Sequence, residues 1–184
     1  MFFLLNKIKM DSKNFVGNED INLEFCLEDE IDIFNLNPTR FIKMKPFTLN
    51  ETPLVVLLKG KLTQENVSFA TLGGNSCYSL GMKFEDDSYQ QLFNELSEKI
   101  DVVVPEWPVN NPSSGKIFFL RLGFNQIQNK FTTKSNLVLK PSTIENLSIK
   151  KDQDIQATVE LKAWFDMKGK KAGVSLKVNY VKFL

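Results

Sequence analysis

The sequence contains no histidine among its 184 residues. This absence removes the commonest general base, every Ser-His or Cys-His nucleophile, and most zinc, haem and non-haem iron sites. The two cysteines, Cys26 and Cys77, lie far apart and form no C-x-x-C pair, which excludes a zinc knuckle and a thioredoxin-type redox site. Two scattered cysteines are typical of a reducing compartment, and we expect them to pack as small buried hydrophobic side chains.

Sequence motifs for nucleotide or metal chemistry are also missing. The glycine pair Gly73-Gly74 follows a predicted strand, but neither G-x-x-x-x-G-K-S/T nor G-x-G-x-x-G is present. The acids Glu28, Asp29, Glu30 and Asp32 form one local run, whereas a magnesium site needs acids that converge from separate elements. We therefore expect no enzymatic activity, no cofactor and no metal, and we interpret the acidic run as a solvated surface.

Length and composition indicate a single globular domain. The chain has 42% hydrophobic and 24% charged residues, and 184 residues can bury a core without a disulfide or a metal. The hydrophobic stretch Met1–Leu5 is interrupted by Lys7 and Lys9, which makes it too short for a secretory or membrane-spanning segment. We expect an intracellular, soluble protein that does not bind membranes.

The net charge of +1 conceals two halves of opposite sign. Residues 1–100 carry 10 basic and 15 acidic side chains, and residues 101–184 carry 13 and 7. Seven of the carboxylates lie in the block Glu19–Asp32, which contains no basic residue. Such an asymmetry points to a polyanion-binding half and an acidic partner-binding segment, although two solvated faces of an ordinary domain would look the same.

The hydrophobic pattern predicts one helix among many strands. From Asp86 to Ile100 the apolar residues recur at helical spacing, and Asp87 with Gln90 suits an N-terminal cap. Alternation or β-branched runs predict strands at Pro53–Leu58, Asn66–Leu72, Tyr78–Phe84, Asp101–Val104 and Ile117–Leu122, with a loop at residues 108–115.

The two clearest strands come last. In Ile155–Phe165 every odd-numbered residue is apolar, and Val174, Leu176, Val178 and Tyr180 share one face of the next strand. Residues 166–173 between them are short enough for a hairpin with a flexible basic tip. The whole pattern predicts a mainly β fold with one or two helices: an OB-like small antiparallel barrel with extensions over residues 21–184. Residues 1–20 are expected to be a flexible arm or an edge strand used in self-association.

Basic and aromatic residues are combined on the strands of the second half. Trp164 lies on the otherwise polar face of its strand, where it requires cover from a ligand or from a second small core. The chain has 21 Lys and 2 Arg, a ratio that favours sequence-independent contact with a nucleic-acid backbone over readout of base edges. Both interpretations of Trp164 stay open on the pattern alone.

The segment Asp154–Leu184 resembles the C-terminal hairpin of viral single-stranded-DNA-binding proteins, from bacteriophages and large DNA viruses. The likeness lies in a strand ending in an aromatic residue, a Gly/Lys turn, and the strand Gly-Val-Ser-Leu-Lys-Val that starts at Gly173. Tyr78–Ile100, a strand leading into an amphipathic helix, is similar to the middle of those proteins. The resemblance covers about half of the chain and implies an OB-like fold, single-strand binding in replication or recombination, no catalysis, and a host-nuclear or viral replication compartment.

One departure from the family concerns the acidic tail with which many phage members recruit replication enzymes. This chain ends instead in Tyr-Val-Lys-Phe-Leu, so a replication-protein partner would have to bind the Glu19–Asp32 block. The leading prediction is a protein that coats single-stranded DNA with little sequence preference. The alternative is a virion or scaffold protein whose acidic and basic halves assemble head to tail.

The residues predicted to bind DNA follow from this combination of rings and cations. The stacking platforms are Trp164, Phe131 and Phe118, with the condition that only one of Phe118 and Phe119 can face solvent. The phosphate contacts are Arg121, Lys130, Lys134, Lys140, Lys162, Lys168, Lys170, Lys171 and Lys177.

Overall fold

The fold was determined from a computed structural model of the chain. It describes residues 20–39, 41–63, 68–72, 75–85, 87–113, 117–123, 131–132, 138–139 and 150–184. The predicted N-terminal arm therefore lies, apart from residue 20, outside the described residues.

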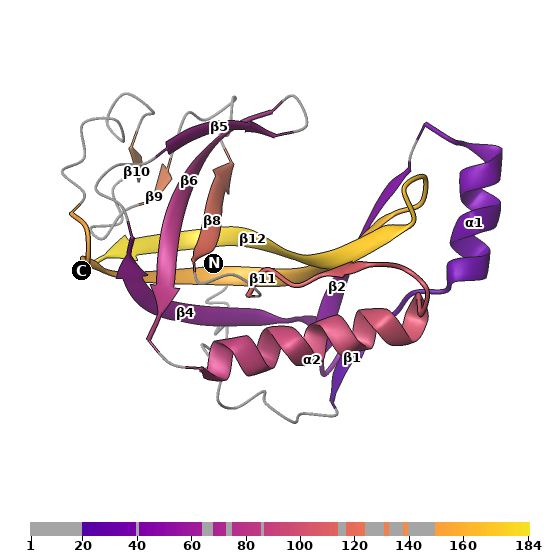
Figure 1. Cartoon of the computed structure of the whole chain (residues 1–184), viewed down its shortest axis with the longest axis horizontal. Coiled ribbons are helices and arrows are strands. Elements are labelled where there is room, and N and C mark those ends of the chain that lie inside the picture. Colours follow the sequence, from indigo (N-terminus) through magenta and orange to yellow (C-terminus); the bar gives the residue numbers. More distant parts are fainter. Residues whose placement is uncertain are drawn as a thin grey trace, which may run out of the picture.

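The fold is organised around a long β-hairpin (Figure 1). Its strands β11 (Asp154–Asp166) and β12 (Lys171–Phe183) are antiparallel along their whole length. On its other edge, β11 pairs first with β4 (Val55–Leu62) and then, from Lys162 onward, with β2 (Ile42–Leu49). The hairpin is therefore shared between two groups of strands.

The first group curls into a barrel that stays open at one seam. β4 pairs with β6 (Asn75–Phe84), and β6 pairs on its two edges with β5 (Ser68–Leu72) and β8 (Phe118–Gly123). β8 then lies against β12, yet no ladder joins these two strands in the described part of the chain. We name this gap the seam.

The second group extends the sheet beyond the barrel. β2 pairs with β1 (Ile21–Leu23) and β3 (Thr52–Pro53), and β7 (Val109–Asn110) adds to β12 in parallel. β9 (Phe131–Thr132) and β10 (Val138–Leu139) form a separate two-stranded ladder. The described residues thus form a mainly antiparallel, unclosed sheet with two helices, which confirms the predicted OB-like class.

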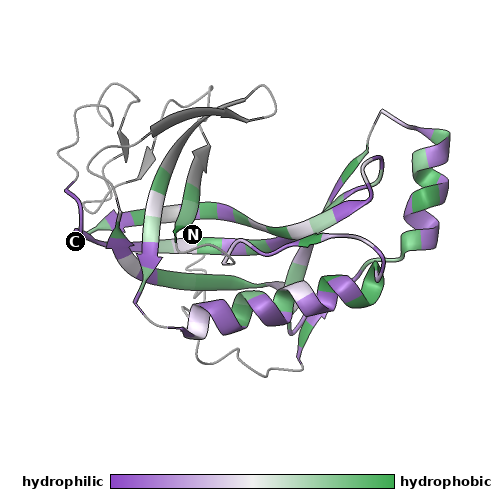
Figure 2. Cartoon of the chain, viewed as in Figure 1, coloured by the Kyte–Doolittle hydropathy of each residue, from purple (hydrophilic) through white to green (hydrophobic). Residues whose placement is uncertain are grey.

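Alternation along the hairpin creates the core. Every odd-numbered residue of β11 from Ile155 to Phe165 is buried, as the sequence predicts, and Figure 2 shows the alternating hydropathy along this hairpin. In β12 the predicted alternation holds only in part. The register shifts opposite Thr158 and Val159, so that Val181 is buried beyond the irregularity. A bulge of this kind reverses which residues of a strand face inward.

Helix α2 (Ser88–Val103) lies below the sheet in Figure 1. The predicted stripe is the buried face of this helix: Tyr89, Leu92, Phe93, Leu96 and Ile100. The predicted cap Asp87 precedes the helix but makes no side-chain capping hydrogen bond. The prediction of a strand at Asp101–Val104 is wrong, because the helix continues to Val103.

Helix α1 (Leu27–Leu36) lies at the far end of the molecule, beyond the tip of the β11–β12 hairpin (Figure 1). The sequence pattern did not predict this helix. Just before it, the Phe25 ring stacks on Phe165 with 3.7 Å between ring centroids. Cys26, expected to be buried, is exposed. In the described residues, no helix is long and apolar enough to span a membrane.

We predict that Tyr89→Phe destabilises the barrel. The buried Tyr89 hydroxyl donates a hydrogen bond to Leu57 O and accepts one from the Lys59 N–H, both at 3.1 Å. Removing it leaves two backbone groups of β4 without this partner, at a cost of about 1–3 kcal/mol. Thermal denaturation should show a lower Tm by several degrees. An unchanged Tm would mean that water replaces the hydroxyl.

Candidate nucleic-acid interface

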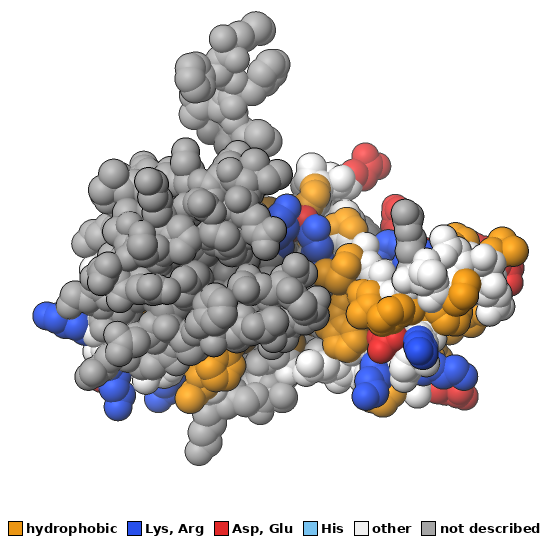
Figure 3. Space-filling view, turned by 90° about the horizontal axis from the view of Figure 1, so that it is seen from above, with side chains coloured by type: hydrophobic (Ala, Val, Ile, Leu, Met, Phe, Trp, Pro, Cys, Tyr) orange, Lys and Arg blue, Asp and Glu red, His pale blue; other side chains and the backbone are white. Residues whose placement is uncertain are grey.

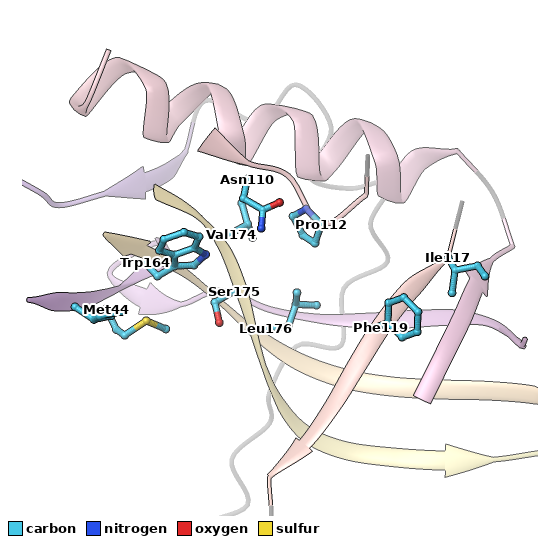
Figure 4. A pocket seen from close by; sticks show the side chains of 10 residues that line it. Met44, Asn110, Pro112, Ile117, Phe119, Trp164, Val174, Ser175 and Leu176 are labelled. Carbon is cyan, nitrogen blue, oxygen red and sulfur yellow. The ribbon is translucent and has the colours of Figure 1, made fainter. Parts of the chain in front are cut away.

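An open groove of about 430 Å³ lies at the seam (Figure 4). Its walls come from four places that are distant in sequence: β2, the β7 region, β8 and the hairpin. The lining residues are Ile42, Met44, Asn110, Pro112, Ile117, Phe119, Trp164, Val174, Ser175 and Leu176. Figure 4 shows Trp164 at one end, Phe119 with Ile117 at the other, and Leu176 between them.

Trp164 is partly buried and lies against Gly173, its neighbour across the hairpin. A Cβ atom on Gly173 would come within 2.8 Å of the Trp164 Nε1 atom and 2.7 Å of the Asn110 carbonyl oxygen. Only a residue without a side chain therefore allows the indole and β7 to approach this strand together. Gly173 fixes the position of the ring at its end of the groove.

The second ring of the groove is Phe119. The prediction that Phe118 is a stacking platform is wrong, because Phe118 is only 3% exposed and packs with Phe84 and Phe93 in the core. Phe119 is 51% exposed and lines the groove. The expectation that one member of this pair faces solvent fits the alternation of β8, and the structure assigns that place to Phe119.

Hydrophobic exposure extends beyond the two rings. Ile42 and Met44 of β2 and Ile117 beside β8 are also exposed and line the groove. Figure 3 shows hydrophobic side chains gathered among charged ones towards the end of the molecule where α1 lies. A contiguous exposed apolar surface is typical of a binding site.

Three predicted phosphate contacts, Lys168, Lys170 and Lys171, gather at the tip of the hairpin. All three are exposed, and none has an ion-pair partner among the residues that the structure describes. The turn is anchored: the Asp166 Oδ1 atom accepts hydrogen bonds from the N–H groups of residues 168 and 169, and the Met167 N–H donates to Phe41 O. The three ammonium groups are thus carried on an ordered turn.

Two further predicted contacts, Lys162 and Lys177, are held by one carboxylate. Lys162 Nζ lies 3.1 Å from Glu160 Oε1, and Lys177 Nζ lies 3.6 Å from Glu160 Oε2. Burial alone would raise the pKa of Glu160, but the two ammonium groups outweigh it and hold the pKa below its ordinary value. Both lysines were predicted to contact phosphates, and the sequence pattern does not indicate the role of Glu160.

One residue of the acidic block, Glu30, is buried in the fold. Glu30 of α1 is buried, with its carboxylate oxygens 3.0 Å from both Lys43 Nζ and Lys45 Nζ of β2. Lys43 Nζ lies within ion-pair distance of Glu30 Oε2. This oxygen has no hydrogen bond of good geometry in the described residues. The interpretation of the whole acidic run as a solvated surface is therefore wrong at Glu30, whereas Glu28, Asp29 and Asp32 are exposed.

The remaining predicted contacts are not placed. Lys130, Lys134 and Lys140 lie outside the described residues, as do the side chains of Arg121 on β8 and Phe131 on β9. The described part of the chain brings together Trp164, Lys162 and Lys177 on adjacent strands of one hairpin, with the cationic tip at its end. Within it, no group of three or more His, Cys, Asp and Glu residues is arranged to hold a metal ion.

Sequence reasoning missed most of the groove. Ile42, Met44 and Leu176 are hydrophobic residues of strands. Their sequence pattern does not indicate whether they are exposed or buried. The available signals were the Phe118-Phe119 doublet and Gly173, the residue across the hairpin from Trp164.

No protein-family model matches the chain, and no curated protein sequence matches it. Among solved structures, it is similar to a C-terminal truncation of the single-stranded DNA-binding protein from bacteriophage Enc34. The TM-score is 0.42 with 11% sequence identity, and the match covers 76% of this chain and 88% of that chain. A likeness of this size defines neither a family nor a function.

We predict that Gly173→Ala displaces the Trp164 ring. The added methyl group meets the indole and a backbone oxygen, and overpacking of this kind costs about 1–3 kcal/mol. In a Trp107→Phe background, the emission maximum of the remaining tryptophan should shift. Lys168→Ala, which truncates an exposed side chain in the turn of the same hairpin, is the control that leaves the emission unchanged. Equal spectra for both variants would contradict the proposed packing.

We predict that docking of α1 weakens in acid. Burial alone would raise the pKa of Glu30, but Lys43 and Lys45 lower it overall. A lowered folded-state pKa gives stability that is complete above the ordinary carboxyl pKa of about 4.3 and is lost as the pH falls through the folded value. The Tm difference between wild type and Glu30→Gln should therefore be largest near pH 7 and shrink below about pH 4. A constant difference would argue against the ion pairs.

Proposed function

We propose that the protein binds single-stranded DNA with little sequence preference, without catalysis, through the groove at the seam. The observation that carries the proposal is that Trp164 and Phe119, from different strands, line one open groove. Flat rings exposed in a groove offer stacking surfaces to unpaired bases, and every base has such a face. Duplex DNA keeps its bases stacked on one another and cannot use these platforms.

Charge around the groove supports the same ligand. Lys162 lies two residues before Trp164 on β11 and shares its face of the sheet. At strand spacing the two residues are about 7 Å apart. The tip lysines 168, 170 and 171 lie at the end of the same hairpin. A single strand whose bases stack in the groove would thus have ammonium groups within reach of its phosphates. The lining itself is mainly hydrophobic and lacks the Arg, Asn or Gln pairs that read base edges, apart from Asn110.

The finer assignments belong to this proposal as well. A protein that coats single strands would serve replication or recombination, and Lys130, Lys134, Lys140, Arg121 and Phe131 would extend the contact surface. Self-association along the strand and recruitment of a replication protein through the exposed acids of α1 would follow the pattern of coating proteins.

An assembly protein is the second candidate, because the groove is hydrophobic enough to accept a segment of another protein. Ile42, Met44, Ile117 and Phe119 are all exposed there. In that case the protein would self-associate at low salt, and oligonucleotides would not perturb its tryptophan fluorescence.

We predict that Phe119→Ala and Trp164→Ala each weaken binding to oligo-dT. Loss of one stacked base costs about 1–3 kcal/mol, which is roughly tenfold or more in Kd. Fluorescence anisotropy of a labelled oligonucleotide measures the change, and thermal denaturation reports whether the fold is intact. Phe119→Ala is the cleaner variant because its ring is half exposed.

Val102→Ala is the matched control, since Val102 is an exposed hydrophobic residue on α2 that does not line the groove. Its Kd should equal that of wild type. For single strands, log affinity should fall with log salt by about 0.7 for each phosphate neutralised. Binding that is equally strong for duplex and oligo-dT, or unaffected by Phe119→Ala, would contradict the proposal.

A further inference from the structure

The charge arrangement beside Trp164 contains one carboxylate and two ammonium groups. On the outer face of the hairpin the residues pair in three successive rows: Trp164 with Gly173, Lys162 with Ser175, and Glu160 with Lys177. Residues two apart on a strand share a face. The carboxylate therefore lies two rows from the indole, with Lys162 between them.

The Glu160 side chain is only 16% exposed and that of Lys162 is 25% exposed, whereas that of Lys177 is 62% exposed. Partly buried charges are screened by salt much less than exposed ones. Lys162, with the shorter contact of 3.1 Å, is held firmly, and Lys177, at 3.6 Å, is held loosely. Both cations of these rows are thus engaged within the protein.

We infer that Glu160 is an internal competitor for nucleic-acid phosphate: its carboxylate holds Lys162 and Lys177 in the free protein, and a phosphate replaces it on binding. This inference rests on the proposed function. Lys177 is the first cation to be released, because it is more exposed and more distant from the carboxylate. Each exchange substitutes one anion for another, so the wild-type protein gains less affinity per lysine than free lysines would provide.

The same arrangement limits the free positive charge in the rows next to Trp164. A cluster of free cations beside an open hydrophobic groove would attract any polyanion. With Glu160 in place, the cations become available only to a ligand that also occupies the groove and brings its phosphates close. Glu160 would thus favour ligands that stack over ligands that are merely anionic.

The test is Glu160→Gln, which keeps the shape of the side chain and removes its charge. We expect its affinity for oligo-dT to rise about three- to tenfold at low salt. The slope of log affinity against log salt should become steeper by about 0.7 for each lysine freed, or about 1.4 for both. Heparin, a polyanion without bases, should gain more than oligo-dT.

Glu98→Gln is the matched control, because it removes the same charge from an exposed position on α2, outside the groove lining. It should change the slope little. Adding Lys177→Gln to Glu160→Gln should remove part of the gain, which a double-mutant cycle measures. If Glu160→Gln does not fold, Glu160→Asp keeps the charge, withdraws it by one methylene and should give a smaller gain.

Two results overturn the inference in different ways. If wild type binds oligo-dT but folded Glu160→Gln binds equally or more weakly with the same salt slope, Glu160 is a structural residue and the proposed function stands. If neither protein binds oligo-dT at any salt concentration, the proposed function fails and the competitor role fails with it.

Discussion

The exchange of partners along β11 is the constraint on which the rest of the structure depends. One edge of this strand pairs with β4 up to Glu160 and with β2 from Lys162, while β12 follows the other edge throughout. The hairpin can therefore contribute to the open barrel at one end and project beyond it at the other. The projecting part brings Trp164 beside Met44 of β2, and the barrel part brings β12 beside β8. The groove is lined by residues from both of these regions.

Burial and charge divide the two faces of the hairpin. The inner face supplies the core and, near the tip, the Phe165 ring on which Phe25 stacks. The outer face carries Glu160, Lys162 and Trp164 in succession. On both faces an acid is held by two lysines, Glu30 by Lys43 and Lys45 and Glu160 by Lys162 and Lys177. Four of the 21 lysines are thus paired with these two acids.

Periodicity in the sequence was sufficient for the elements whose burial is set by their own pattern. The buried stripe of α2 and the inward residues of β11 were predicted correctly. In each element the apolar residues recur without interruption, at helical spacing in α2 and at every second residue in β11. The block Glu19–Asp32, with its seven carboxylates, concealed a helix, since α1 is held in part by ion pairs from Glu30 to Lys43 and Lys45, which are distant in the sequence. Phe118 and Phe119 could not be assigned from the doublet, because a strand pattern defines two faces without saying which is wet. The bulge in β12 depends on the register with β11 and leaves no local signal.

The seam has a mechanical consequence. Where strands are joined by a ladder, separating them breaks backbone hydrogen bonds. No ladder joins β8 and β12 within the described residues, so separating these two strands would not break such a row. The distance between Phe119 and Leu176 across the groove is therefore not fixed by a ladder in the described barrel. A groove with one yielding wall can accept ligands of different size, and such tolerance would arise from the absence of a ladder between the described parts of β8 and β12 rather than from any particular side chain.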